Sequence, residues 1–213
     1  DIWATGFGFG LDRQGRGDGT AANFTTLADA GDGATLVRDL LISNSLVLAS
    51  GVNELQTPTG GAILSGVLSG SGPLLQTGSG WLTLTGTNTY AGGTNLAEGV
   101  VVADAAGALG SGDLTFTGGT LRLTANSTGV AWGPRIKNST AAVVLEAAGL
   151  NYSLDGIAAS NTAGLTKAGQ GVLSLVGASA HGGDTRVAGG TLKLVSRSTA
   201  TTVAATIATA TGV

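Results

Sequence analysis

The single histidine is the first place where this chain could support nucleophilic or acid–base chemistry. His181 lies three residues before Asp184 in a chain rich in serine and threonine. An imidazole held between a hydroxyl and a carboxylate is the arrangement that activates a hydrolytic nucleophile. One histidine and one aspartate in a glycine-rich stretch single out no nucleophile, so we interpret His181 as an exposed corner residue and expect no catalytic residues.

Carboxylates could support a second chemistry, because a pair of them can cleave a polysaccharide. In this chain only Glu98 with Asp113, or Asp104 with Asp113, are spaced so that they could meet. Residues 29–33 (DAGDG) offer oxygens of the kind that calcium prefers, but the nine-residue glycine–aspartate repeat of calcium-binding β-rolls is absent. We therefore expect no glycosidase or lyase site, no bound metal and no cofactor.

The tripeptide Arg16-Gly17-Asp18 is a candidate recognition element. Some host integrins bind Arg-Gly-Asp when a flexible loop presents it. The tripeptide is short enough to occur by chance, and its surroundings are glycine-rich, so a plain loop is the favoured interpretation and binding through these three residues is the alternative.

Composition limits the elements that could position such residues. The 213 residues include 38 glycines, and 42% are hydrophobic, which favours a folded chain over collagen or disorder. Only 4% are aromatic, so a compact core of large side chains is not expected, and the abundant Thr, Val, Leu, Ser and Asn favour strands and tight turns. A net charge of −3 with scattered basic residues excludes a nucleic-acid footprint. The absence of cysteine excludes disulfides.

A long internal repeat organises most of the chain. The stretch that begins at Leu74 recurs without a gap from Leu165. The same offset carries Thr94 onto Thr185. Repeats of this kind are the sequence signature of solenoids and other stacked architectures.

A shorter motif, in which a glycine precedes alternating residues, lies inside the long repeat. It occupies residues 80–84, 99–103, 119–123, 171–175 and 190–194, so its glycines recur at nearly constant spacing within each copy. Because side chains alternate between the faces of a strand, the second and fourth apolar residues of each motif should point inward. Their partners should face solvent, and these are Thr83, Arg122, Ser174 and Lys193.

The motif predicts an all-β protein, a single-stranded right-handed parallel β-helix (β-solenoid) with about 19–22 residues per coil and about ten coils. We divide the chain into residues 1–59, an N-terminal solenoid or capping segment, residues 60–195, a solenoid with repeats, and residues 196–213, a strand-prone C-terminal tail. No pattern in the chain requires a helix.

At residues 82–94 the sequence (LTLTGTNTYAGGT) resembles the passenger-associated transport repeat of bacterial autotransporters, and residues 108–112 and 118–123 continue the resemblance. The second copy departs from the pattern, since His181 stands where Tyr90 stood. The resemblance covers about residues 60–195. It implies a secreted passenger folded as a parallel β-helix, located outside the cell or on the bacterial outer-membrane surface, and attached to a membrane only through a barrel that this chain does not contain.

The resemblance implies an adhesive or structural protein, not an enzyme, that works in adhesion, aggregation or biofilm formation. The expected partners are other cell-surface proteins, polysaccharide or a host surface, and the chain itself end to end. The solvent-facing residues Thr83, Arg122, Ser174 and Lys193 are the candidate binding face. Two alternatives remain open: a subunit of a self-assembling extracellular fibre, and a polysaccharide-acting β-helix enzyme.

Overall fold

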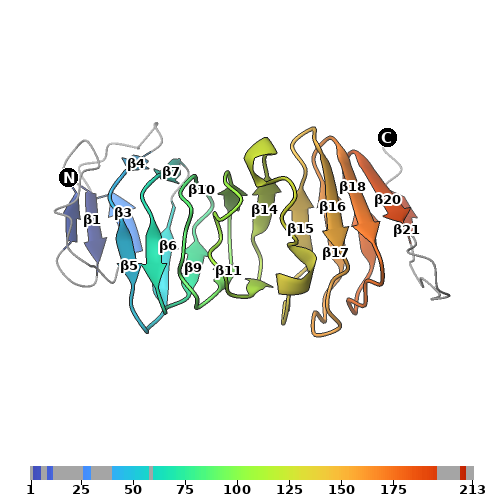
Figure 1. Ribbon diagram of the computed structural model, residues 1–213, viewed down its shortest axis with the longest axis horizontal. Helices are drawn as coiled ribbons and strands as arrows, with labels where there is room; N and C mark the ends of the chain where they lie inside the picture. The colour runs from blue at the N-terminus through green and yellow to red at the C-terminus, as the bar shows by residue number, and fades with distance from the viewer. Residues whose placement is uncertain are drawn as a thin grey trace.

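The computed structural model is an elongated stack of short strands, with the N-terminal strands at one end and the C-terminal strands at the other (Figure 1). The structure describes residues 41–57 and 60–195 with their side chains. It describes residue 40 and the strands at 2–5, 9–11, 26–29 and 207–209 by their backbone alone. Within these ranges there are strands and two single-turn 3₁₀ helices but no α-helix. The all-β prediction is confirmed.

Parallel sheets run along the stack, and every strand pair from β4 onward is parallel. The nine-stranded sheet comprises β4 (Leu40–Ile42), β7 (Gly61–Leu64), β10 (Trp81–Leu84), β12 (Val100–Ala103), β14 (Thr120–Leu123), β15 (Val143–Glu146), β17 (Leu165–Ala168), β19 (Thr185–Val187) and β21 (Ile207–Thr209). The four-stranded sheet comprises β6 (Asn53–Gln56), β9 (Leu74–Thr77), β11 (Thr94–Leu96) and β13 (Leu114–Phe116). The two smaller parallel sheets are β5 (Leu46–Leu48) with β8 (Leu68–Gly70), and β16 (Asn151–Asp155) with β18 (Val172–Val176) and β20 (Thr191–Val195).

The order of strands along the chain makes this a parallel β-solenoid. In the early coils the chain passes from the nine-stranded sheet to the two-stranded sheet, then to the four-stranded sheet, and back. In the later coils it alternates between the nine-stranded and three-stranded sheets. The predicted parallel solenoid is therefore confirmed.

The number of coils is smaller than the chain length suggested. The solenoid has about eight turns and not the expected ten. The expectation of ten was wrong because β1 (Ile2–Thr5), β2 (Phe9–Leu11) and β3 (Thr26–Asp29) form a separate antiparallel sheet, in which strands reverse direction instead of advancing by one coil.

Coil length varies more than the repeat indicated. The register along the nine-stranded sheet pairs Leu82 with Val101 and Val101 with Leu121, so these two coils have the length that the glycine spacing predicts. The next coil, which runs from Leu121 to Leu145, is longer than either of them. It is longer because it contains both 3₁₀ turns, η1 (Ala125–Ser127) and η2 (Gly133–Arg135).

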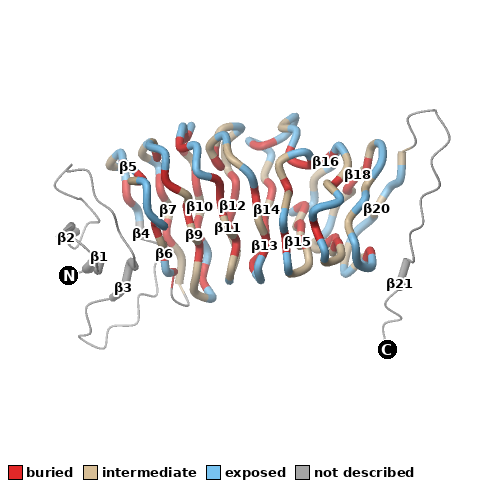
Figure 2. The backbone as a smooth tube through the Cα atoms, turned by 90° about the horizontal axis from the view of Figure 1, so that it is seen from below, coloured by how far each residue is buried: buried red, intermediate tan, exposed pale blue. Residues whose placement is uncertain are grey.

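The core is a set of inward rows running along the solenoid axis. Leu82, Val101 and Leu121 are in register and fully buried, and Figure 2 shows buried segments in successive strands through the middle of the stack. Burying each such side chain contributes about 1.5–3 kcal/mol. Leu194 was also expected to point inward, but it is 44% exposed because β20 is the outermost strand of its sheet.

Buried asparagines hold the corners between coils. The Oδ1 atom of Asn88 accepts a hydrogen bond from the Leu68 N–H (2.7 Å), and its Nδ2 donates to the Ala108 carbonyl (2.5 Å). Asn161 accepts in the same way from the Ser139 N–H (3.0 Å). Each side chain satisfies backbone groups that the turn leaves without a strand partner, so one residue bonds to neighbouring coils.

The two copies of the long repeat lie on different faces of the solenoid. Strand β10 of the first copy belongs to the nine-stranded sheet, whereas its counterpart β18 belongs to the three-stranded sheet. Four coils carry the register of the nine-stranded sheet from Leu82 to Lys167. The repeat instead carries Leu82 onto Leu173, which lies further along the chain than Lys167 and therefore on the next face of the solenoid.

Candidate functional site

The four predicted solvent-facing residues form two pairs on two different faces. Thr83 and Arg122 lie in one row of the nine-stranded sheet, with Val102 between them. Ser174 and Lys193 are direct neighbours in the three-stranded sheet. Lys193 is exposed and the other three are half-buried, so all four point away from the core. Their use as a binding face stays a prediction, now for two surfaces instead of one.

The most organised outward cluster is centred on Arg122. Its guanidinium carbon lies 3.9 Å from the ring centroid of Trp81, and its Nε and Nη2 atoms donate to the two oxygens of Glu146, at 2.9 Å each. A bidentate arginine–carboxylate pair fixes the plane of the guanidinium, and a cation over an indole adds about 0.5–1 kcal/mol at an exposed site. The Arg122 side chain is therefore fixed by its contact with Trp81 and by its ion pair with Glu146.

Trp81 and Arg122 come from strands that do not touch. Strand β12 lies between β10 and β14, so the two side chains meet across it. Val102 on β12 points outward, yet it is only 6% exposed, as expected for a residue beneath this contact. We call Trp81, Val102, Arg122 and Glu146 the indole platform.

The sequence did not reveal this cluster. Alternation along residues 81–84 was a signal that Trp81 points outward, because Leu82 and Leu84 point in. The position of Glu146 could not be found in the same way, since the coil that brings it beside Arg122 is longer than the glycine spacing predicts.

His181 occupies the position of Tyr90 and makes the same kind of contact. Its Nε2 lies 2.9 Å from Thr185 Oγ1, as the Tyr90 hydroxyl lies 2.6 Å from Thr94 Oγ1. Both contacts span the glycine pair of a corner. Burial raises the pKa of Tyr90 to about 12, so its hydroxyl stays neutral.

Both ring nitrogens of His181 are engaged by hydroxyls, because Nδ1 also lies 3.1 Å from Ser179 Oγ. Asp184 therefore does not orient the ring, and the arrangement is not that of a triad. The expectation of an exposed histidine was wrong: His181 is half-buried, since it bridges its corner.

Acidification should weaken this corner. Burial lowers the pKa of His181 below the ordinary value of 6.5, so near that pH the unfolded chain takes up a proton that the folded chain does not. The stability contributed by neutral His181 is present above pH 6.5 and is lost as pH falls toward its folded pKa. We expect the melting temperature to fall between pH 7.5 and 5 more in the unsubstituted chain than in His181→Tyr, measured by circular dichroism. Parallel profiles for the two proteins would contradict this.

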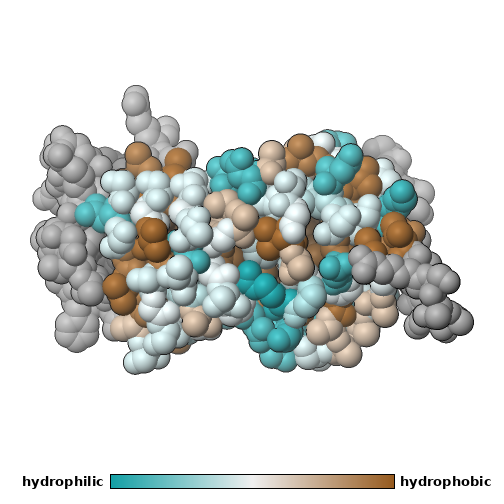
Figure 3. Space-filling view, in the orientation of Figure 1, coloured by the Kyte–Doolittle hydropathy of each residue, from teal (hydrophilic) through white to brown (hydrophobic). Residues whose placement is uncertain are grey.

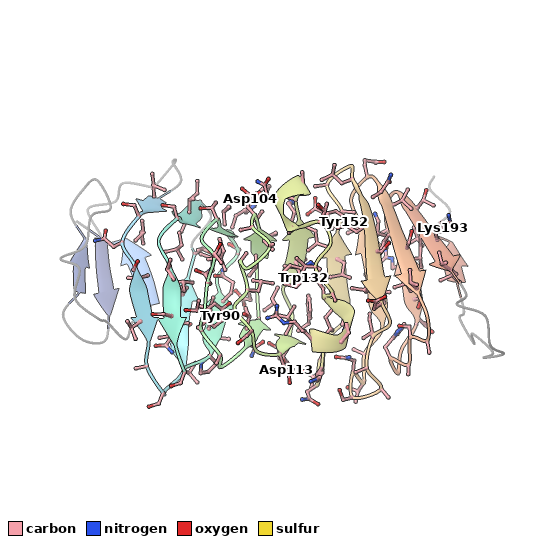
Figure 4. The ribbon with its side chains drawn as sticks, in the orientation of Figure 1. Tyr90, Asp104, Asp113, Trp132, Tyr152 and Lys193 are labelled. Atoms are coloured by element: carbon pink, nitrogen blue, oxygen red, sulfur yellow. The ribbon has the colours of Figure 1, made fainter. Side chains whose placement is uncertain are left out.

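The acidic residues do not form a catalytic pair. Figure 4 shows Asp104 and Asp113 at opposite edges of the solenoid. Asp104 accepts from Thr124 Oγ1 (2.5 Å) and Asn126 Nδ2 (3.0 Å), Asp113 accepts from Lys137 Nζ (2.9 Å), and Glu98 accepts from the Gly78 N–H (3.2 Å). Each carboxylate is thus bound separately, and the possibility that Asp113 meets Asp104 or Glu98 is not realised. In the described part of the chain no group of three or more His, Cys, Asp or Glu side chains could hold a metal ion.

One buried charge supports the fold. Lys167 points inward from β17 and is fully buried, and burial lowers its pKa. Its ammonium group donates to the carbonyls of Ala168 (2.7 Å), Gly169 (2.7 Å) and Gly189 (3.0 Å). Gln76, its counterpart in the first copy, likewise donates from inside to the Thr77 carbonyl (2.8 Å). Both side chains bond to the corner that follows their own strand.

Both copies of the long repeat match the model of a known protein family. The family model described as the passenger-associated-transport-repeat matches residues 74–103 and 165–194, which are the strands and corners just described. Two stretches of the chain therefore match this repeat. The resemblance to autotransporter passengers is thereby confirmed.

A curated relative agrees with this assignment. Over 218 aligned residues the chain is 36% identical to the adhesin BmaC autotransporter of Brucella suis biovar 1 (strain 1330). The alignment covers 87% of this chain and 6% of that adhesin, so the chain spans only a small part of its relative's length. No solved structure matches the chain significantly. The chain is thus similar to a repeat region of an autotransporter passenger and to a distant adhesin.

Two other predicted features of the chain are not described with their side chains. Arg16, Gly17 and Asp18, and the calcium-like stretch at residues 29–33, lie outside the residues described with their side chains. Among the described residues, no helix has the length and apolar character needed to cross a membrane.

Proposed function

We propose that this chain is a stretch of surface-displayed or secreted autotransporter passenger that serves as a stiff adhesive rod. The observation that carries the proposal is that both passenger-associated transport repeats lie within one continuous parallel solenoid. Similarity to an autotransporter adhesin supports the adhesive role. The partner is a cell surface or its matrix.

The surface of the rod supports binding rather than catalysis. Asp104 and Asp113 are bound separately and both nitrogens of His181 are engaged by hydroxyls, so these groups do not form an acid–base pair. On the face shown in Figure 3, apolar side chains are scattered among polar ones and do not merge into one apolar patch. A surface of this kind suits contacts distributed along a rod and not a single deep site.

The adhesive role is tested by attachment of beads. Beads coated with the purified chain should bind to cultured epithelial cells in a saturable way, and soluble folded chain should inhibit the attachment. Beads coated with albumin, or with the chain after denaturation, are the matched controls. Equal attachment of all three kinds of bead would refute the proposal.

A further inference from the structure

We propose that the indole platform binds the sugar rings of an uncharged polysaccharide, with one ring lying against Trp81. The inference rests on the proposed adhesive function, because it names the chemical class of the partner and the surface that contacts it. It is carried by the exposure of Trp81, the pairing of Arg122 with Glu146, and the absence of other charged residues among the outward positions within the strands from β4 to β17.

Trp81 presents an apolar surface to solvent, where an apolar side chain lowers the solubility of the protein. It is 46% exposed even though Arg122 lies over its ring. The residue in register with it on β7 is Gly61, which has no side chain to cover the indole from that side. Aromatic side chains with one open surface and a polar neighbour suit ligands that combine apolar and polar groups. A sugar ring does so, because its C–H face can lie on the indole while its hydroxyls point to the rim.

Arg122 supplies fixed polar groups beside that surface. Its Nε and Nη2 atoms are bound to Glu146, and neither of these bonds uses Nη1. The Glu146 oxygens keep lone pairs beyond those that accept from arginine. The platform therefore presents donors and acceptors next to the indole in a geometry set before any ligand arrives, and such preorganisation reduces the entropy cost of binding.

Charge selects an uncharged ligand over an acidic one. Between β4 and β17 the outward residues of the nine-stranded sheet other than Arg122 and Glu146 are all uncharged: Leu41, Gly61, Ile63, Trp81, Thr83, Val100, Val102, Thr120, Val144, Thr166 and Ala168. Arg122 and Glu146 neutralise each other at 2.9 Å. A polyanion would thus find no net positive charge here, and it would meet a protein whose net charge is −3.

The shape of the sheet favours a polymer over a single sugar. Successive strands lie about 4.8 Å apart, so a chain laid along the solenoid axis meets a new pair of outward residues at each step. Thr120, Val144 and Thr166 continue the row of Trp81 across β14, β15 and β17. Small polar and apolar side chains in one row can contact successive rings without a deep pocket.

The test uses cellohexaose and chitohexaose, two uncharged oligosaccharides whose β-linked rings carry C–H groups on both faces. Binding to the full chain is measured by isothermal titration calorimetry and by the shift of the tryptophan indole N–H signals in NMR spectra. Oligogalacturonate of equal length is the acidic comparison. We expect at least one uncharged oligosaccharide to bind, to shift the indole signal of Trp81, and to bind more tightly than the acidic one.

Two substitutions locate the site. Trp81→Ala should weaken binding about tenfold or more, because exposed aromatic anchors dominate recognition surfaces. Asn151→Ala, at an exposed position of β16 in the three-stranded sheet, is the matched control and should bind as the unsubstituted chain does. Circular dichroism melting curves check that both variants fold.

Failure of this inference can be told apart from failure of the proposed function. If neither uncharged oligosaccharide binds, if oligogalacturonate binds more tightly, or if Trp81→Ala binds unchanged, the platform is not the site proposed. Bead attachment to cells would then decide the adhesive role by itself. Attachment that persists with Trp81→Ala beads, together with no sugar binding, refutes the platform and leaves the adhesive function intact.

Discussion

Substitution of Gly72 by alanine is expected to destabilise the solenoid by more than about 3 kcal/mol. A Cβ atom at this corner would overlap the backbone carbonyl of Ala49 in the preceding coil and would lie 2.5 Å from Asn53 Nδ2. The Ala49 carbonyl cannot rotate away as a flexible side chain could, so the two coils must separate locally. Separation would also break the bond from the Gly72 N–H to the Leu48 carbonyl (3.1 Å). The free energy of unfolding from urea titrations gives the measurement.

Gly51 provides the matched control. A Cβ atom there would meet nothing within 4 Å, and the residue is exposed. Gly51→Ala should therefore leave stability unchanged or raise it by a few tenths of a kcal/mol, because alanine restricts the unfolded chain more than glycine does. Equal effects of the two substitutions would show that the coils are not in close contact at Gly72.

Substitution of Lys167 by alanine has the second large expected effect, a loss of about 3–5 kcal/mol. The substitution removes the donor to three carbonyls, those of Ala168, Gly169 and Gly189, from a side chain that is itself fully buried. It also leaves a cavity where the aliphatic stem packed between Leu145 and Val187. Because Gly189 belongs to the next coil, the contact between coils weakens as well as the corner itself.

Lys167→Gln distinguishes the two causes. Glutamine is the residue at the equivalent position of the first copy, where Gln76 donates to the Thr77 carbonyl and to Thr57 Oγ1 (2.6 Å). It restores part of the stem and a donor, so it should recover at least half of the loss. A glutamine variant as unstable as the alanine variant would mean that the charge itself, and not a donor at the corner, is what the site requires.

Much of the architecture could be predicted from the sequence because it depends on neighbours along the chain. Alternation after Gly80, Gly99 and Gly119 placed Leu82, Val101 and Leu121 inward, and the spacing of these glycines equals the length of the coils they begin. The corner contact between Tyr90 and Thr94 recurs between His181 and Thr185, four residues apart in both cases. Such a contact depends only on the geometry of the local turn, so it forms regardless of which sheet the neighbouring strands belong to.

The face on which each strand lies was decided only by the tertiary structure. An inward leucine satisfies the core equally well from any side of a solenoid, so alternation distinguishes inside from outside but not one sheet from another. The sum of coil lengths determines the face, and the two 3₁₀ turns lengthen the coil that runs from Leu121 to Leu145. Four coils carry Leu82 only onto Lys167 whereas the repeat carries it onto Leu173, and this mismatch places the second repeat on a new face and separates Ser174 and Lys193 from Thr83 and Arg122. The longer coil brings Glu146 beside Arg122 and so completes the indole platform.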